Sequence, residues 1–276
     1  MKKLLGKLWD ALVYLLLLLG GLTMLVPFFW MVSTSFKAPG AVFDLPVEVW
    51  PRELHLENYQ RVLTAVPFGR WYLNSLLVAL GLTFLNLTSG AMAGYAFARF
   101  RFPGQGALFL LFLATLMIPV HVLIIPLFIL MRNLGWVDTY YALILPGLFD
   151  AFAIFLMRQH FLQLPRELEE AAIVDGATPW QVYWKVALPL AAPALATLGT
   201  FTFLAGWNSF LWPLIVTHSL EMRPLTVGLA VFQNQFSTEW TVLMAGLTLG
   251  TLPPILVFLL AQRYFIQGLT LGSLKG

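Results

Sequence analysis

The 276-residue sequence contains no cysteine, which excludes a disulfide framework and any thiol chemistry. Charged residues are also scarce, at 11%, whereas hydrophobic residues make up 59% of the chain and aromatic residues 15%. Soluble domains of ordinary composition carry about 25% charged residues. The net charge of +3 is too small to indicate a nucleic-acid surface, and we find no DNA- or RNA-binding motif. The composition therefore predicts a membrane protein.

Catalytic motifs are missing as well. The sequence has no H-E-x-x-H zinc motif, no G-x-S-x-G nucleophile motif, no phosphate-binding P-loop and no paired intramembrane acids. We therefore expect no catalytic or metal site in this chain. Without a P-loop, this chain has no such route to ATP hydrolysis.

Six apolar runs are long enough to cross about 30 Å of hydrocarbon as helices. They cover approximately residues 11–32, 71–98, 106–131, 139–160, 188–216 and 241–262. Lys2, Lys3 and Lys7 before the first run resemble the start of a signal peptide, but the run is too long for a signal core and no small-residue cleavage site follows. We expect an uncleaved anchor and a single transmembrane domain over residues 1–276.

The basic residues predict an orientation. If both termini are cytoplasmic, ten of the 16 Lys and Arg residues lie in inner segments and six in outer segments, in agreement with the positive-inside rule. Two outer loops then cover residues 37–70 and 218–240, the first with a short amphipathic helix after an extended stretch. The loop at 163–187 faces the cytoplasm.

That inner loop holds four carboxylates between Glu167 and Asp175 in the segment "ELEEAAIVD". Local rules predict a helix–turn–helix here, because Pro165 suits a helix start, Gly176 a sharp turn, and Thr178 followed by Pro179 a second helix start. Leu168, Ala171, Ala172 and Asp175 share one helical face, which is mostly small enough for close approach by another backbone. Local chemistry alone supports a solvated loop and a docking element equally.

The spacing in this loop resembles a family motif. Glu170-Ala171-Ala172, three residues, Gly176, nine residues, and Val186-x-Leu188-Pro189 is similar to the "EAA" loop of ATP-binding-cassette importer permeases, with Val where Ile is usual. Nearly the whole chain resembles the carbohydrate branch of that family, through "NSLLVA" (74–79), "AGYAFARFRFPG" (93–104), "IPLFILMRNLGWVDTYYALILP" (125–146), "MAGLTLGTLPP" (244–254) and "AQRYFIQGLTLGSLKG" (261–276). Within that branch the likeness is to the six-helix subunit of maltose-type importers. The resemblance implies an all-α polytopic membrane protein with the type I importer (MetI-like) permease fold and a cytoplasmic coupling helix.

The same resemblance implies partners and site residues. A second homologous permease, two copies of a cytoplasmic ATPase that hold ATP and Mg, and an extracytoplasmic sugar-binding protein would complete the importer in the inner membrane of a prokaryote. This chain itself would bind no cofactor. The coupling residues would be Glu170, Ala171, Ala172, Asp175, Gly176, Leu188 and Pro189, and the C-terminal "GLTLGSLKG" would be a second ATPase contact.

Residues of the substrate pathway are less clearly marked. Asp150 is the clear carboxylate within a span, and either faces a cavity or makes a structural hydrogen bond to a neighbouring helix. Asn208 is a further candidate, as are Gln233, Asn234 and Gln235, whose amides suit sugar hydroxyls in the outer loop that reaches the binding protein in maltose-type importers. Polar residues on the second span, Asn74, Ser75, Asn86, Thr88 and Ser89, are expected to join helices. Trp207 and Trp212 are expected to be interfacial anchors.

The sequence therefore predicts the permease subunit of an ATP-driven sugar importer. A permease for another polar solute, such as a glycerol phosphate or a polyol, is the alternative within the family. An ion-coupled secondary transporter would need coupling carboxylates and usually a repeated half, and the sequence shows one intramembrane carboxylate and no obvious repeat.

Overall fold

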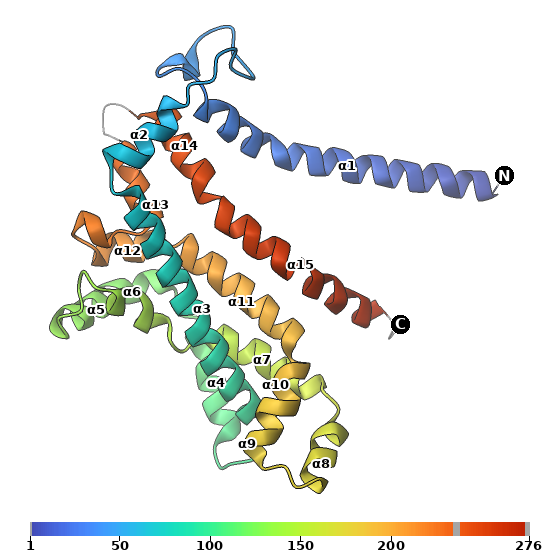
Figure 1. The fold of residues 1–276 in the computed structure, drawn as a ribbon. Helices are drawn as coiled ribbons and strands as arrows, with labels where there is room; N and C mark the ends of the chain where they lie inside the picture. Colours follow the sequence, from blue (N-terminus) through green and yellow to red (C-terminus); the bar gives the residue numbers. More distant parts are fainter. Residues whose placement is uncertain (1, 234–237, 274–276) are drawn as a thin grey trace. The chain divides into compact units, whose positions relative to one another are not determined.

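The structure is a computed structural model that describes residues 2–233 and 238–273 (Figure 1). These residues form helices, and their β-type pairing is limited to an isolated bridge between Gln233 and Thr238. Backbone contacts divide the chain into two compact units. Unit 1 comprises residues 1–68 and 229–251, and unit 2 comprises residues 69–228 and 252–276. Each unit is described by itself.

Unit 1 contains three main helices: α1 (Lys2–Ser35), α2 (Glu57–Ala65) and α14 (Trp240–Gly250). Helix α14 packs against both α1 and α2. The end of α1 is fixed by Asn58 of α2, whose side-chain amide donates to the carbonyls of Ser35 (3.0 Å) and Lys37 (2.9 Å). The short helix predicted in the loop at 37–70 is thus present as α2.

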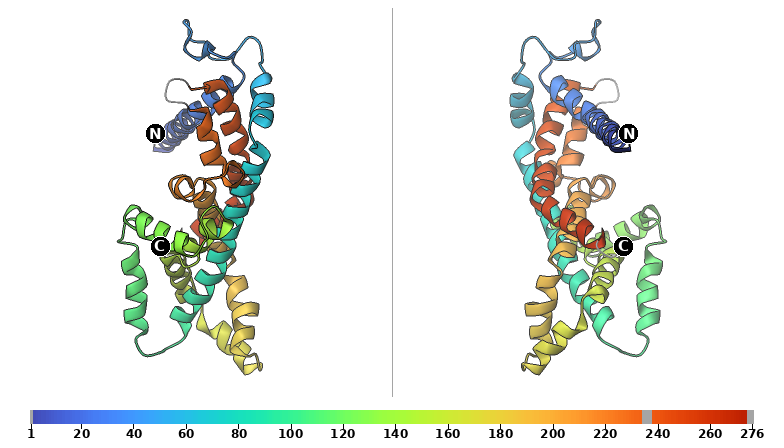
Figure 2. Two further views of the ribbon diagram at one scale, coloured as in Figure 1. Left: turned by 90° about the vertical axis from the view of Figure 1, so that its left-hand side faces the viewer. Right: turned by 90° about the vertical axis from the view of Figure 1, so that its right-hand side faces the viewer.

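Unit 2 is a bundle around the long helix α3 (Phe68–Arg99). Its other helices are α4 (Gln105–Thr115), α5 (Val120–Asn133), α6 (Tyr140–Ile144), α7 (Ala151–Gln163), α8 (Arg166–Val174), α9 (Pro179–Val182), α10 (Leu188–Leu190), α11 (Ala192–Trp207), α12 (Leu211–Val216), α13 (Leu225–Leu229) and α15 (Leu252–Ser273). Figures 1 and 2 show α8 and α9 at the same end of this unit as the connection between α3 and α4.

The six predicted spans appear in two forms. Three are single stretches long and apolar enough to cross a membrane: Trp9–Ser35, Phe68–Arg99 and Trp240–Tyr264. The other three are helix pairs bent at a short break: α4 and α5 by 97°, Tyr140–Gly147 and α7 by 41°, and Pro179–Leu190 and α11 by 74°. The all-α fold with up to six spans is confirmed, but half of the spans are broken.

Proline and helix caps account for the breaks. Pro119 is the N-cap residue of α5, where it has an extended backbone, so the α4 helix cannot continue through it. Asp150 is the N-cap residue of α7, and its carboxylate accepts a hydrogen bond from the Phe152 amide at 2.7 Å. In the third pair, Pro193 lies in the first turn of α11, as suits a position without an N–H partner.

Helix α3 packs closely on α7 through two glycines. A Cβ atom on Gly94 would lie 2.7 Å from Met157 Cβ, and one on Gly90 would lie 2.8 Å from Ala153 Cβ. Neither position has room for a side chain. The pattern Gly90-x-x-x-Gly94 is therefore a genuine close-packing seam between two helices.

The polar residues of α3 join it to other segments, as predicted. Asn86 and Ser89 donate to the carbonyls of Gly147 (2.9 Å) and Leu148 (2.7 Å). Near the other end, Asn74 and Ser75 bond to the segment 220–225. Thr88 differs, because its hydroxyl bonds within its own helix to the carbonyls of Phe84 and Leu85.

One of the two tryptophans near the end of α11 does not have the predicted role. Trp207 is buried and packs against Tyr72 and Phe203, with ring centroids 5.2 and 6.0 Å away, so the prediction of an interfacial anchor is wrong for it. Trp212 is half-buried and donates its indole N–H to the carbonyl of Ala142 at 2.8 Å. Both rings thus make contacts within unit 2, where large aromatic side chains contribute to packing.

Candidate functional site

The predicted helix–turn–helix is present as α8, a glycine turn and α9. The turn has a Schellman arrangement, in which the amides of Gly176 and Ala177 donate to the carbonyls of Ile173 (3.0 Å) and Ala172 (2.9 Å). Gly176 has φ of +86°, a conformation that a Cβ atom disfavours. Thr178 then caps α9 in a reciprocal capping box with Gln181. Local chemistry therefore fixes the angle between the two helices.

Two adjacent glutamates of α8 have opposite surroundings. Glu169 is buried, and its carboxylate accepts a hydrogen bond from Arg99 Nε at 2.7 Å and another from the Tyr95 hydroxyl at 3.0 Å. Glu170 is exposed. Successive side chains on a helix point about 100° apart, so α8 contacts the end of α3 through one carboxylate and presents the next one outward.

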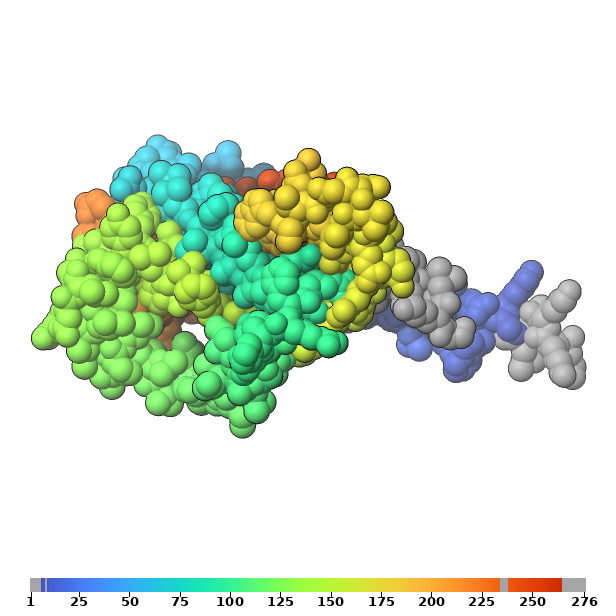
Figure 3. Space-filling view, turned by 90° about the horizontal axis from the view of Figure 1, so that it is seen from below, coloured from blue at the N-terminus to red at the C-terminus, as the bar shows by residue number. Residues whose placement is uncertain are grey.

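The outward face of α8 mixes small, acidic and apolar residues. Ala171, Asp175 and Gly176 are exposed, and Ala172 is half-buried. Three large apolar side chains accompany them, Leu168, Ile173 and Val174, the last with 86% of its surface exposed. Figure 3 shows α8 and α9 in yellow on this face, beside the teal end of α3. An exposed face of this kind is suited to docking another protein.

The remaining two predicted coupling residues, Leu188 and Pro189, lie where α9 leads into α11. The backbone between them is π-helical over Tyr183–Ala187, a form that often occurs at functional sites. Leu188 packs against the buried core of unit 2, whereas Pro189 is exposed in the short helix α10. These two residues thus shape the junction rather than extend the outward face of α8.

Two hollows flank the glutamates. A crevice of about 200 Å³ lies over Arg99, Glu169 and Glu170, and an apolar groove of about 400 Å³ runs between Met92 and Trp180. Tyr95 lines both hollows. No cluster of three His, Asp or Glu side chains suited to a metal ion occurs within the described ranges.

The predicted pathway residues are dispersed. The carboxylate of Asp150 accepts the capping hydrogen bond of α7 and not a bond from a neighbouring helix, which was one of its two expected roles; its place on a substrate pathway stays a prediction. Asn208 is exposed at the end of α11, and Gln233 is exposed beside the bridge to Thr238. Asn234 and Gln235 lie outside the described residues.

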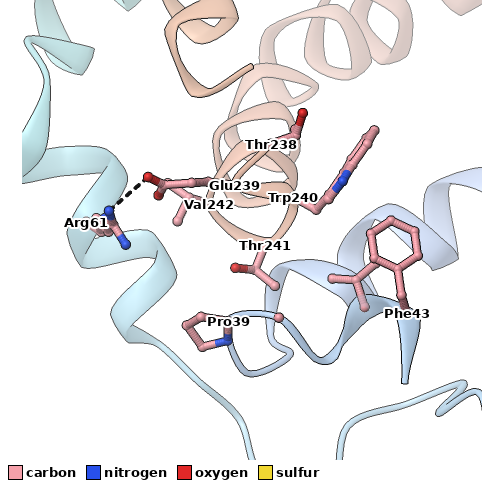
Figure 4. Close-up of a pocket in the computed structure, with 10 residues that line it drawn as sticks. Pro39, Phe43, Arg61, Thr238, Glu239, Trp240, Thr241 and Val242 are labelled. Atoms are coloured by element: carbon pink, nitrogen blue, oxygen red, sulfur yellow. Dashed lines mark hydrogen bonds and ion pairs between the residues drawn. The ribbon is translucent and has the colours of Figure 1, made fainter. Parts of the chain in front are cut away.

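A cavity of unit 1 lies next to that bridge (Figure 4). It has a volume of about 350 Å³ and is lined by the turn at 39–43, by Arg61 of α2 and by residues 238–242. Arg61 and Glu239 form an ion pair at 2.9 Å, and the rings of Phe43 and Trp240 meet edge to face with centroids 6.2 Å apart. This cavity was not predictable from the sequence, because its walls come from segments almost 200 residues apart.

Long apolar helices, broken spans and a capped helix–turn–helix with an exposed face are the features of a polytopic membrane protein. The chain matches the family of binding-protein-dependent transport system inner membrane components over residues 86–271. It belongs to that family, and it is therefore an inner-membrane component of a binding-protein-dependent transport system.

Relatives of this chain include two curated permeases. It is 40% identical over 227 residues to the arabinooligosaccharides transport system permease protein AraQ of Halalkalibacterium halodurans, which covers 82% of this chain and 81% of that protein. It is 35% identical over 268 residues to the sn-glycerol-3-phosphate transport system permease protein UgpE of Yersinia pestis, which covers 94% of this chain and 95% of that protein.

The fold is also similar to a solved structure. A chain from a bacterial ABC transporter that imports the acidic polysaccharide alginate superposes with a TM-score of 0.82 and 28% sequence identity. The superposition covers 94% of this chain and 97% of the other. The predicted permease fold is thereby confirmed.

Proposed function

We propose that this chain is the permease subunit of an ATP-binding-cassette importer that moves a sugar delivered by an extracytoplasmic binding protein. ATP and Mg would bind to two copies of a separate cytoplasmic ATPase, and a second homologous permease would complete the transmembrane pathway. Both termini and α8 would face the cytoplasm. The observation that carries the proposal is the presentation of the EAA pattern on the exposed face of α8.

The chemistry of that face suits a groove on an ATPase. Glu170 supplies a carboxylate for charge-assisted hydrogen bonds, each of which contributes about 1.5–3 kcal/mol when sheltered. Ile173 and Val174 supply apolar area that only a partner could bury, since both are exposed in unit 2. Ala171 is small enough to let a partner backbone approach closely.

A sugar is favoured as the substrate by the relatives. AraQ is named for arabinooligosaccharides and the solved structure for alginate, and both are carbohydrates. On the outer side, the loop that contains Gln233, Asn234 and Gln235 would contact the binding protein, and the neighbouring cavity with Arg61, Glu239 and Trp240 would form part of the same surface. The similarity to UgpE keeps sn-glycerol 3-phosphate as the second candidate substrate.

The proposal is tested with the complete importer. The permease is purified with its partner permease and ATPase, reconstituted in liposomes, and supplied with the binding protein loaded in turn with arabinooligosaccharides, alginate oligosaccharides, maltooligosaccharides and sn-glycerol 3-phosphate. We expect an oligosaccharide to stimulate both ATP hydrolysis and uptake. Stimulation by glycerol phosphate alone would favour the second candidate, and ATP-independent uptake driven by an ion gradient would refute an importer of this class.

The docking role of α8 is tested by charge reversal. Glu170→Lys should keep the permease in the membrane but abolish most uptake, because a cation replaces the carboxylate offered to the ATPase. Glu167→Lys makes the same charge change about one turn away on the same helix and serves as the matched control, with uptake close to that of the unmodified importer. Normal uptake by Glu170→Lys would contradict the docking role.

A further inference from the structure

The buried contact between Arg99 and Glu169 is unlike the other ion pairs of the described residues. Its side chains are only 7% and 10% exposed, whereas each of the other pairs has at least one side chain that is half exposed or more. Both carboxylate oxygens are used, one by Arg99 and one by Tyr95. Arg99 also donates through Nη2 to the carbonyl of Leu164, at 3.0 Å.

Stability alone is a poor explanation for this arrangement. A buried ion pair loses hydration that its mutual attraction only partly restores, and apolar replacements are often as stable. An ion pair with hydrogen bonds is directional, because the bonds form only when the two side chains keep a particular distance and angle. The pair between Arg99 and Glu169 therefore fixes the position of α8 relative to the end of α3.

Arg99 and Tyr95 connect α8 to a rigid part of the bundle. Arg99 is the last residue of α3, and Tyr95 lies one turn before it on the same face. The Tyr95 ring packs edge to face on Phe161 of α7 at 5.2 Å and against Tyr183 at 5.1 Å. Gly94, directly before Tyr95, and Gly90, one turn earlier, hold α3 against α7 without room for a side chain.

The far end of α3 is also fixed, to the segment 220–225. The Trp71 indole donates to the carbonyl of Leu220 at 2.6 Å, and the Asn74 amide donates to the carbonyls of Glu221 (2.6 Å) and Arg223 (3.0 Å). Helix α3 is continuous over its 32 residues between these attachments. An α-helix of that length spans about 48 Å, roughly the thickness of a bilayer with its headgroups.

We propose that Arg99, Glu169 and Tyr95 form a mechanical joint through which displacement of α8 is passed into α3 and along it to the segment 220–225. The joint rests on the proposed function, since an ATPase must move α8. These three are positioning residues: Glu170 and its exposed neighbours meet the ATPase, whereas Glu169 transmits the movement to the membrane-spanning bundle.

The joint is tested with Glu169→Gln, which keeps the shape of the side chain but removes the charge that Arg99 faces. In the reconstituted importer, we expect the variant to bind the ATPase normally and to transport about tenfold less sugar per ATP hydrolysed, in the range of ordinary coupling energies between sites. Glu167→Gln removes an exposed carboxylate from the same helix and should leave this ratio unchanged.

A second variant covers the case in which the unpaired Arg99 prevents folding. The double substitution Arg99→Met with Glu169→Leu replaces the ion pair by apolar side chains of similar size, which should preserve folding and membrane insertion. We expect it to lose coupling as Glu169→Gln does. Full coupling in the double variant would overturn the proposal, because an apolar contact would then serve equally well.

A distance measurement separates a joint from a merely structural contact. The absence of native cysteine allows spin labels to be attached at Arg166→Cys on α8 and Phe84→Cys on the exposed side of α3. With the joint intact, the distance between the labels should be the same in nucleotide-free and ATP-trapped importers. In the Glu169→Gln variant, the distribution of distances between the two labels should broaden or shift between the nucleotide-free and the ATP-trapped importer. A nucleotide-dependent distance in the intact protein would overturn the proposal.

Failure of the joint can be distinguished from failure of the proposed function. If the unmodified importer shows no hydrolysis stimulated by its loaded binding protein, the proposed function falls and the joint falls with it. If the unmodified importer is coupled and both variants are coupled to the same degree, only the joint is refuted.

Discussion

The neighbouring glutamates of α8, Glu169 and Glu170, differ in burial although they are adjacent in the sequence. Both carboxylates are visible in the sequence, and the family pattern identifies Glu170, yet nothing local shows that Glu169 points inward. Its partner Arg99 lies 70 positions earlier, so no local pattern links the two residues. The role of a charged residue in this protein thus depends on a distant partner that composition does not reveal.

Glycine at position 94 is required by space. An alanine Cβ there would lie 2.7 Å from Met157 Cβ and 2.8 Å from the backbone nitrogen of Arg158, so one of the two helices must move. We expect Gly94→Ala to lower the free energy of unfolding by about 1–3 kcal/mol, the usual range for overpacking. Thermal denaturation of the detergent-solubilised protein measures the effect.

Gly106 provides the matched control for this prediction. It also lies within a helix, α4, but a Cβ atom there would meet no atom within 4 Å. Gly106→Ala should be neutral or slightly stabilising, because alanine favours a helix by about 0.5–1 kcal/mol over glycine. Equal melting temperatures for the two variants would show that the seam between α3 and α7 is looser than the structure indicates.

At the scale of elements, the turn between α8 and α9 sets the direction of the docking face. Gly176→Val places a β-branched residue at φ of +86°, which costs about 1–2 kcal/mol and should change the angle between the helices. We expect sugar uptake to fall while ATP hydrolysis persists, as measured in reconstituted importers. Gly176→Asn should retain most uptake, since asparagine tolerates this conformation. Similar uptake by both variants would contradict the role given to the turn.

Elements with a local chemical signal could be predicted from the sequence. The caps at Thr178 and Gly176 fix the helix–turn–helix, and apolar length alone locates α1, α3 and the stretch Trp240–Tyr264. Pro119 lies inside the predicted span 106–131, and the chain bends there because proline cannot continue a helix. The size of that bend, 97°, was not predictable, because packing rather than local preference decides how far two helix segments turn from each other.

The candidate site was only partly predictable for a related reason. The exposed residues of α8 follow from its periodicity, whereas the buried contacts of Glu169 and the walls of the outer cavity join segments distant in the chain. Asp150 is a further example. A carboxylate within an apolar run suggests a pathway, and the sequence does not show that this residue also begins α7 as its cap.

At the scale of the whole molecule, the orientation in the membrane is open to a direct test. The cysteine-free chain allows single cysteines to be introduced at Glu53→Cys in the loop at 37–70 and at Glu167→Cys in α8. With the proposed topology, a membrane-impermeant maleimide should label the first variant in intact cells and the second only after permeabilisation. The reverse pattern would invert the topology and remove the docking face from the ATPase.

The arginine at the end of α3 also limits how this permease can be recombined with its relatives. A chimaera that takes residues 165–189 from another importer would keep Arg99 from its own scaffold, and a graft without a carboxylate at the matching position would leave a cation buried beneath it. Domain-exchange experiments would therefore need to exchange the two sites together, although they lie 70 positions apart in the sequence.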